Sequence, residues 1–369
     1  MASQPLFTGP GPDTEAEARK IRLMIVDDSA VARAVLARMI SGNPAFEIVD
    51  QVAGAQEALD SLARVSVDVI LLDIEMPGRN GIAALPELIE KSQGARILIV
   101  SALAEEGAAT TVEALTLGAA DTLAKPGRNA FGGRFSEILC ERLMRLGTAG
   151  AAVAPGMPRQ PQPLEALVPV SEPRSDLGPI QCVAIGASTG GLHAITEFFR
   201  ALPDSFDAPI LITQHLPEVF MPFFAQQLRG STGRKAVVAR EGMTIERGVL
   251  HIAPGNAHLC VERHGARVVV RLSRQRVESR CLPSVDPMFD SVAEVYGDAA
   301  VGIVLSGMGR DGCIGADKLA ATGAELLVQN IDSSVVWGMP GSIAKAGIAT
   351  AVLPPAAIAT HLGKRRASR

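Results

Sequence analysis

Ser188 stands where a buried strand is expected to meet a helix. It lies in the glycine-rich turn 186–191, between the apolar run 182–185 and the amphipathic segment 192–201. A hydroxyl on a strand-to-helix turn can attack a carbonyl, and the free N–H groups at the helix N-terminus can stabilise the resulting oxyanion. Short glycine- and serine-rich turns are common after strands, so this motif alone is weak support for a serine nucleophile.

Two further apolar runs end near groups that could activate such a serine. The run 208–215 ends on His215, and the run 299–306 leads into the glycine-rich segment that contains Asp311. Near-continuous apolar runs are typical of buried parallel strands, whose carboxyl ends form one crevice. Because a serine needs an imidazole base, and the imidazole needs an orienting carboxylate, we predict a Ser188–His215–Asp311 triad. Its order along the chain differs from the Ser, Asp, His order of α/β-hydrolases.

Four other histidines and two other carboxylates compete for these roles. His258 could line the site, whereas the remaining histidines are expected on a surface or within turns. Asp286 could equally cap the helix that Pro287 opens. The competing residues are His193, His251, His258, His264, Asp286 and Asp290.

The amino-terminal third alternates short apolar runs with amphipathic stretches. This alternation predicts a doubly wound (βα)5 domain with a parallel sheet. The runs that we expect to form strands are 21–26, 46–52, 67–72, 96–100 and 122–124.

Polar groups follow these expected strands. Asp27 and Asp28 follow the first, Asp73 follows the third, Ser101 ends the fourth and Lys125 ends the fifth. Because clustered carboxylates repel unless a cation joins them, we predict that the three aspartates bind Mg²⁺. A hydroxyl and an ammonium group opposite the metal would hold a phosphoryl group on Asp73. Asp73 is therefore the predicted phosphorylation site, with Ser101 and Lys125 as switch residues.

These motifs resemble two known families. The amino-terminal set resembles a response-regulator receiver domain, and the remainder resembles the catalytic domain of the CheB chemotaxis methylesterases. The resemblance implies an α/β architecture in which a (βα)5 receiver is joined by a linker to a parallel-sheet serine hydrolase domain. The segments that carry it are Asp27-Asp28, 72–78, Ser101, Lys125-Pro126, 185–191, 214–217, 252–258, 283–286, 305–312 and 338–340.

The resemblance also implies a function. The family removes methyl esters from glutamyl side chains in the cytoplasmic helices of chemoreceptors, and many members deamidate receptor glutamines. Chemoreceptors would be the substrates, and a histidine kinase would be the phosphodonor. Mg²⁺ would serve the receiver, and the hydrolase reaction would need no cofactor. Backbone groups near Met308 and Thr189 would stabilise the oxyanion, and the unphosphorylated receiver would cover the active site.

Three positions depart from the family pattern. Thr122 stands where receivers commonly place an aromatic residue, Leu282 stands where an arginine is expected, and Asn330 stands where an aspartate is frequent. The first bears on coupling through the receiver, and the other two bear on receptor choice and substrate contacts. The triad and the phosphorylation site remain whole.

Length and composition set the expected domains. A chain of 369 residues is long enough for two separate cores. Seven prolines between Pro155 and Pro179 indicate a semi-extended linker. We expect a disordered leader over 1–20, a receiver domain over 21–146, a linker over 147–179 and a catalytic domain over 180–360.

Charge and cysteine usage narrow the function classes. The 35 basic and 39 acidic residues give no electrostatic case for nucleic-acid binding, and we expect neither a signal peptide nor a membrane span. Five scattered cysteines fit a reducing cytoplasm. Six arginines within 263–280 form either a solvated hairpin face or a docking surface for an acidic receptor helix. A regulatory binding protein with a silent hydrolase domain is the alternative function, but an intact triad favours an enzyme.

Overall fold

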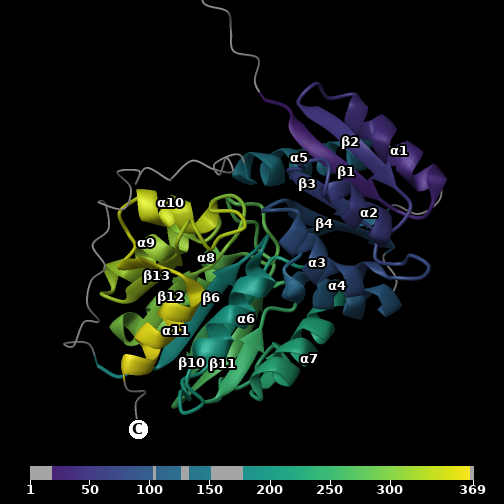
Figure 1. The fold of residues 1–369 in the computed structure, drawn as a ribbon. Helices are drawn as coiled ribbons and strands as arrows, with labels where there is room; N and C mark the ends of the chain where they lie inside the picture. The colour runs from purple at the N-terminus through teal and green to yellow at the C-terminus, as the bar shows by residue number, and fades with distance from the viewer. Residues whose placement is uncertain (1–18, 103–104, 126–132, 151–177, 366–369) are drawn as a thin grey trace, which may run out of the picture.

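The computed structural model describes residues 19–102, 105–125, 133–150 and 178–365. Within these ranges the chain forms two α/β units, each built on its own parallel sheet (Figure 1). The predicted leader, apart from residues 19 and 20, and most of the predicted linker lie outside the described residues.

The amino-terminal unit is a five-stranded parallel sheet in the order β2-β1-β3-β4-β5. This is the predicted (βα)5 arrangement. Its central strand is buried along its whole length, because helices cover both faces of such a sheet. The strands are β1 (Ile21–Val26), β2 (Phe46–Val52), β3 (Val69–Leu72), β4 (Arg96–Ala102) and β5 (Asp121–Lys125). The helices are α1 (Ala30–Ser41), α2 (Ala55–Leu62), α3 (Gly81–Lys91), α4 (Glu105–Leu117) and α5 (Gly133–Gly150).

The strand β3 is shorter than the apolar run that predicted it. Asp68 precedes the strand, and its carboxylate accepts a hydrogen bond from the Arg22 backbone N–H at 2.8 Å. The helix α5 ends at Gly150, four residues beyond the predicted domain boundary at residue 146. A Cβ on Gly147 would lie 2.7 Å from Ile21 Cδ1, so glycine allows this last part of α5 to approach β1.

The carboxyl-terminal unit is a seven-stranded parallel sheet in the order β14-β13-β12-β6-β7-β9-β8. The strands are β6 (Cys182–Ala187), β7 (Ile210–Gln214), β8 (Lys235–Val238), β9 (Val249–Ile252), β12 (Ala300–Val304), β13 (Glu325–Gln329) and β14 (Ala351–Leu353). The helices are α6 (Gly191–Ala201), α7 (Met221–Thr232), α8 (Val285–Tyr296), α9 (Cys313–Ala321), α10 (Met339–Lys345) and α11 (Pro355–Lys364).

The three strands that precede the predicted triad residues are neighbours in this sheet. β6 pairs with β12 on one side and with β7 on the other, and all three are buried along their whole length. Parallel pairing brings their carboxyl ends to the same edge of the sheet. The fold therefore gathers the segments after these strands at one place.

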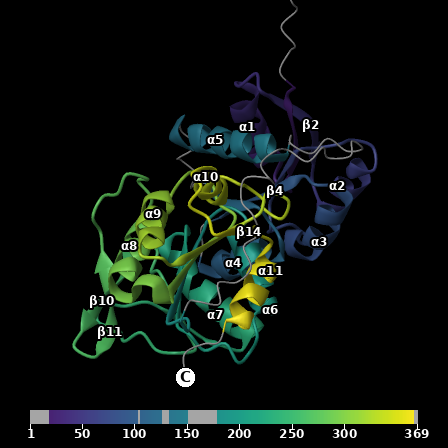
Figure 2. The ribbon, with the colours of Figure 1, turned by 90° about the vertical axis from the view of Figure 1, so that its left-hand side faces the viewer.

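A hairpin stands apart from the seven-stranded sheet. The strands β10 (His258–His264) and β11 (Arg267–Ser273) pair antiparallel, and α8 lies beside them (Figure 2). This hairpin carries part of the arginine-rich segment. Arg263 donates to the Val295 carbonyl oxygen, and Arg271 lies 3.6 Å from the Glu262 carboxylate. Both arginines therefore have partners within the carboxyl-terminal unit.

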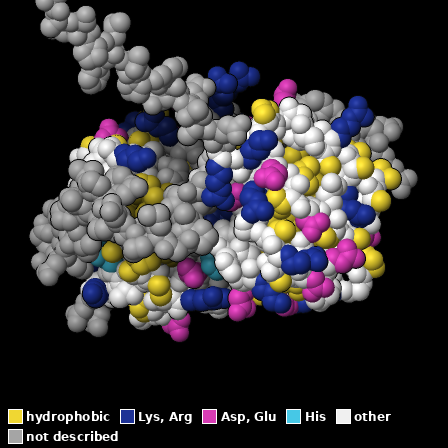
Figure 3. Space-filling model, turned by 45° about the horizontal axis from the view of Figure 1, so that its top comes forward, with side chains coloured by type: hydrophobic (Ala, Val, Ile, Leu, Met, Phe, Trp, Pro, Cys, Tyr) yellow, Lys and Arg dark blue, Asp and Glu magenta, His cyan; other side chains and the backbone are white. Residues whose placement is uncertain are grey.

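Surface charges are mixed. On the face drawn in Figure 3, basic and acidic side chains of the described residues are interspersed. Among the helices that the structure describes, none combines the length and the apolar character needed to cross a bilayer.

Candidate active site and receiver site

The turn after β6 holds Ser188 in a tightly packed position. The Ser188 backbone N–H donates to the Ser306 carbonyl oxygen at 3.0 Å, and the Gln214 side chain donates to the Ser188 carbonyl oxygen at 2.9 Å. Gly190 follows with a φ of 76°, and a Cβ there would lie 2.5 Å from Val335 Cβ. Glycine is therefore required both for the left-handed turn and for the close packing around it.

His215 and Asp311 are in direct contact. His215 Nε2 lies 2.8 Å from Asp311 Oδ2, and the Asp311 side chain is almost fully buried. Two more donors hold the same carboxylate: the Ser284 hydroxyl at 2.5 Å and the Val285 backbone N–H at 2.7 Å. The carboxylate is therefore fixed by three donors from two separate segments, His215 and residues 284–285.

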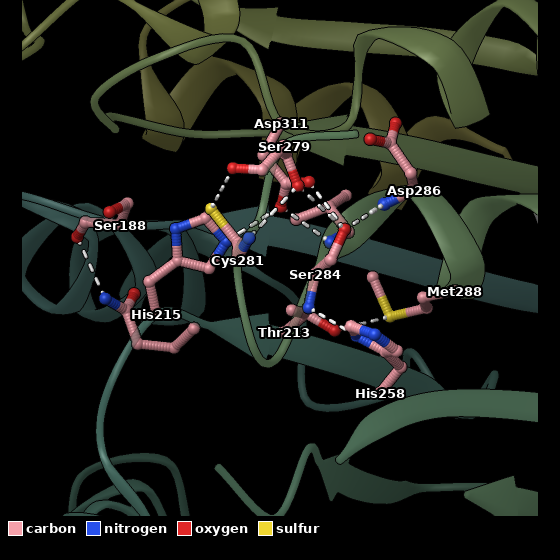
Figure 4. A network of polar contacts seen from close by, with 12 residues as sticks. Ser188, Thr213, His215, His258, Ser279, Cys281, Ser284, Asp286, Met288 and Asp311 are labelled. Atoms are coloured by element: carbon pink, nitrogen blue, oxygen red, sulfur yellow. Dashed lines mark hydrogen bonds and ion pairs between the residues drawn. The ribbon is translucent and has the colours of Figure 1, made fainter. Parts of the chain in front are cut away.

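This contact decides which ring nitrogen of His215 can act as a base. Asp311 accepts the proton on Nε2, so Nδ1 keeps its lone pair in the neutral ring. Figure 4 shows Ser188 and Asp311 on different sides of the imidazole ring. Among the described residues, no hydrogen bond joins the Ser188 hydroxyl to the ring. Such bonds are often loose in the absence of substrate, and they tighten when substrate binds.

The environment of Asp311 keeps this carboxylate ionised. Burial alone would raise its pKa, but the hydrogen bond and charge of His215, together with the Ser284 and Val285 donors, hold the pKa below its ordinary value. An ionised Asp311 stabilises the protonated imidazole that forms when His215 takes a proton.

Neither alternative carboxylate takes the place of Asp311. Asp286 accepts a hydrogen bond from the Gly315 backbone N–H at 2.8 Å, and burial together with the nearby charge of Asp311 raises its pKa to about 6. Asp286 is not the cap of α8: Ser284 caps this helix, which begins at Val285, before Pro287. Asp290 pairs with Lys318 at 2.7 Å.

The alternative histidines have other surroundings. His193 on α6 contacts the Thr116 carbonyl oxygen at 3.2 Å, and His264 is exposed at the end of β10. His251 is buried in β9, where desolvation lowers its pKa to about 4. His258 is also buried, so both differ from the expected solvated histidines of a turn.

Ser284 supports the site in a way that sequence reasoning missed, together with His258, which sequence reasoning named as a residue that could line the site. His258 Nδ1 accepts the Ser284 backbone N–H at 2.9 Å, and His258 Nε2 contacts the Gln275 carbonyl oxygen at 2.8 Å. Ser284 in turn donates to Asp311 (Figure 4). A chain of hydrogen bonds thus runs from the hairpin to the carboxylate. The only signal in the sequence was a small hydroxyl residue at a helix start, which usually indicates a cap alone.

Two backbone N–H groups near Ser188 are available to a ligand. Among the described residues, neither the N–H of Thr189 nor that of Met308 donates a backbone hydrogen bond. These are the two positions predicted to stabilise an oxyanion. The Thr189 side chain has a different contact, because its hydroxyl donates to Asp121 Oδ2 of the amino-terminal unit at 3.1 Å.

The amino-terminal unit contacts the Ser188 turn directly. The Gly190 N–H donates to the Ala120 carbonyl oxygen at 2.7 Å, one residue before the Asp121 that binds Thr189. The helix α4 lies beside α6 and α7 (Figure 1). Val335 and Val336 join the hydrophobic cluster of α5, and Arg145 of that helix contacts the Met308 sulfur. The ends of β5, α4 and α5 therefore meet the segments around the candidate nucleophile.

The predicted carboxylate cluster of the amino-terminal unit is also assembled. Lys125 Nζ lies 2.7 Å from Asp27 Oδ2 and 2.5 Å from Asp73 Oδ2. Oxygen atoms of Asp27, Asp28 and Asp73 lie within 4.8 Å of one another. The cluster thus gathers three carboxylates around a single ammonium group. A hard divalent cation would offset the remaining negative charge, so these oxygen donors fit Mg²⁺.

Asp73 is a buried carboxylate of this cluster with a raised pKa. Burial and, to a smaller extent, the neighbouring charge of Asp27 raise this pKa. Lys125 lowers it, but the pKa stays above its ordinary value. Ser101 lies nearby, is buried and contacts the Thr111 hydroxyl at 3.3 Å. A cavity of about 400 Å³ adjoins this region and is lined by Ile74, Glu75, Met76, Asn80, Ser101, Gly107 and Thr110.

The three residues that depart from the family pattern lie in distinct places. The Thr122 carbonyl oxygen accepts a hydrogen bond from Arg142 at 2.6 Å. Leu282 is half exposed, one residue after Cys281 and two before Ser284. Asn330 holds the Ser333 hydroxyl at 2.5 Å in the loop after β13.

Comparisons with known proteins agree with both units. Residues 183–362 match the family model of the CheB methylesterase, and residues 23–130 match that of the response regulator receiver domain. The chain is 38% identical to protein-glutamate methylesterase/protein-glutamine glutaminase 1 of Paramagnetospirillum magneticum, over 98% of this chain and 99% of the relative. It is 41% identical to protein-glutamate methylesterase/protein-glutamine glutaminase 2 of Caulobacter vibrioides, over 94% and 99%. The crystal structure of the Thermotoga maritima CheB methylesterase catalytic domain is 32% identical and covers 50% of this chain and 98% of its own, with a TM-score of 0.49.

Proposed function

The chain belongs to the family of CheB protein-glutamate methylesterases/protein-glutamine glutaminases, and from this we propose that Ser188, His215 and Asp311 carry out the hydrolysis. The observation that carries the assignment is the 2.8 Å contact between His215 and Asp311 at the sheet edge that also holds Ser188. The protein is a receiver-regulated enzyme of chemotaxis adaptation.

In this proposal each residue of the triad has one task. The Ser188 hydroxyl attacks the carbonyl carbon of the glutamyl side chain while His215 Nδ1 takes its proton. Asp311 holds the Nε2 proton and stabilises the imidazolium ion. The N–H groups of Thr189 and Met308 donate to the oxyanion as the tetrahedral intermediate forms.

The leaving group distinguishes the two reactions of the family. His215 returns its proton to the departing oxygen of a methyl ester or to the departing nitrogen of an amide, so methanol or ammonia leaves. Water then attacks the acyl-serine with His215 as base, and the product in both cases is a glutamate side chain. The substrates that we propose are glutamyl methyl esters and selected glutamines on the cytoplasmic helices of chemoreceptors.

The amino-terminal unit serves as the switch. We propose that a histidine kinase transfers a phosphoryl group to Asp73, while Asp27 and Asp28 help to hold Mg²⁺ and Lys125 with Ser101 holds the phosphoryl oxygens. When bound, Mg²⁺ offsets negative charge during this transfer. The contacts of Ala120 and Asp121 with the Ser188 turn support a resting state in which the receiver restrains the hydrolase. The five free cysteines are consistent with a cytoplasmic location.

Methanol release from methylated receptor helices tests this function, measured with and without a small-molecule phosphodonor. We expect release in both conditions and faster release with the phosphodonor. A serine-directed fluorophosphonate should label the wild type and leave Ser188→Ala unlabelled. Labelling of the wild type without any methanol or ammonia release would favour a binding protein over an enzyme.

A further inference from the structure

Cys281 lies beside the His215–Asp311 pair, although the mechanism above gives it no role. Its Sγ atom, a ring nitrogen of His215 and a carboxylate oxygen of Asp311 lie within 4.8 Å of one another. Figure 4 shows the sulfur next to the imidazole ring. Burial, with the charge of Asp311, raises the pKa of this thiol, so the metal-free thiol is protonated and does not compete with Ser188 as a nucleophile.

The three donors match the preferences of zinc. Zn²⁺ binds imidazole nitrogen, thiolate sulfur and carboxylate oxygen at about 2.0 to 2.3 Å, with a water as fourth ligand in open sites. Three protein ligands around one ion stand roughly 3 to 4 Å apart. The three atoms here lie within 4.8 Å of one another, so small side-chain movements would bring them around one ion. The cysteine thiol donates a long hydrogen bond to the Ser279 carbonyl oxygen, at 3.6 Å, so little is lost when it turns toward a metal.

The surroundings of this cluster are those of a supported metal site. Metal-binding carboxylates usually accept further hydrogen bonds that fix their orientation. Asp311 accepts two, from Ser284 and Val285, and both come from the segment that follows Cys281. His215 and Cys281 are half-buried, which leaves the cluster open on one side to an ion from solvent.

We propose that His215, Cys281 and Asp311 form an inhibitory zinc site within the active centre. The inhibition rests on the proposed function of His215, whereas the metal binding does not. The thiol proton leaves to solvent, and bonds form from zinc to sulfur, to Asp311 oxygen and to His215 Nε2. The proton of Nε2 moves to Nδ1, so the ring nitrogen available to Ser188 can no longer accept a proton.

This site differs in chemistry from the carboxylate cluster of the receiver. Asp27, Asp28 and Asp73 offer only hard oxygen donors, which suit Mg²⁺. The cluster at Cys281 includes a soft sulfur and an imidazole nitrogen, which favour zinc over magnesium. A large excess of Mg²⁺ should therefore occupy the receiver without protecting the hydrolase from zinc.

Zinc titration of the full-length enzyme in excess Mg²⁺ tests the inhibition. Methanol release should fall as zinc rises and should return after chelation. Cys281→Ala should keep the basal activity and raise the zinc concentration for half inhibition by at least about tenfold, the size expected for a damaged metal site. Cys313→Ala, which removes another half-buried thiol outside the cluster, should behave as wild type.

Cobalt binding provides a readout that does not depend on activity. With Co²⁺ in place of zinc, the wild type and Ser188→Ala should both show a thiolate-to-cobalt charge-transfer band, and Cys281→Ala should lack it. Equal inhibition of wild type and Cys281→Ala by zinc, or absence of the band in the wild type, would overturn the proposal. A band in a protein without hydrolase activity would leave the metal site standing and refute the proposed function instead.

Discussion

Two buried carboxylates, Asp311 and Asp73, stand at corresponding edges of the two sheets and have opposite electrostatic surroundings. Asp311 accepts hydrogen bonds from His215, Ser284 and Val285, and its pKa lies below the ordinary value. Asp73 has Lys125 as its main partner and a second carboxylate as neighbour, and its pKa is raised. Asp311 already has its hydrogen-bond partners and only orients another group. Asp73 belongs to an incomplete site that a cation and a phosphoryl group would complete.

The largest effect is expected when the negative charge of Asp311 is removed. Asp311→Asn should lower kcat by about 10⁴-fold, because an amide favours the wrong tautomer of His215. The fold and the phosphorylation of Asp73 should persist. Single-turnover kinetics on methylated receptor helices measures the loss, and a variant that retains a tenth of wild-type kcat would remove Asp311 from the mechanism.

The second prediction concerns the removal of the Asp73 carboxylate from the receiver site. Asp73→Asn should abolish acid-labile, Mg²⁺-dependent phosphate incorporation and with it the stimulation by a phosphodonor. Basal methanol release should remain, since Asp73 does not touch the hydrolase triad. A radiolabelled phosphodonor provides the measurement. A label that persists on this variant would place the phosphorylation site elsewhere.

The third prediction separates the two regions physically. A fragment that begins at Gly178 should be about tenfold more active than the unphosphorylated full-length chain, because a restraint of about 1.4 kcal/mol suffices for that factor. Both proteins are assayed on the same methylated substrate. A fragment that is no faster would mean that the receiver recruits or activates.

The fourth prediction weakens the support of Asp311 while leaving it in place. Ser284→Ala removes one of three donors and should lower kcat/KM by roughly tenfold, in keeping with the loss of a hydrogen bond to a charged group. The pKa of Asp311 should also rise, because a donor to its ionised form is lost. Ser284→Thr, which keeps the hydroxyl, should restore kcat/KM. An unchanged kcat/KM in Ser284→Ala would make Ser284 a purely structural cap.

The smallest effects concern stability and should have opposite signs. Asp311 has a lowered pKa, so its ionised form stabilises the fold above its unfolded pKa and that contribution is lost as pH falls. Asp73 has a raised pKa, so its ionisation costs stability at neutral pH. At pH 7, Asp311→Asn should lower and Asp73→Asn should raise the free energy of unfolding of the affected unit, each by on the order of 1 kcal/mol. Urea titration without Mg²⁺ measures both changes.

Sequence alone predicted the parts of the molecule that local patterns encode. Apolar runs marked the strands, and a polar residue just after a run marked Ser188, His215 and Asp73. The contacts that refine the site join segments far apart in the chain. Ser284 meets Asp311 across 27 residues, and Thr189 meets Asp121 across 68. No periodicity or motif reports such pairings, because they depend on how finished elements pack together.

The hydrogen bond from Gly190 to Ala120 offers a way to watch the two units part. The Gly190 amide precedes α6, and within the described part of the chain its acceptor belongs to the receiver. Its protection from exchange with solvent deuterium should therefore depend on docking, whereas amides inside α6 depend on the helix. The exchange rate of the Gly190 amide, divided by that of the amides inside α6, therefore measures how often the receiver uncovers the active site.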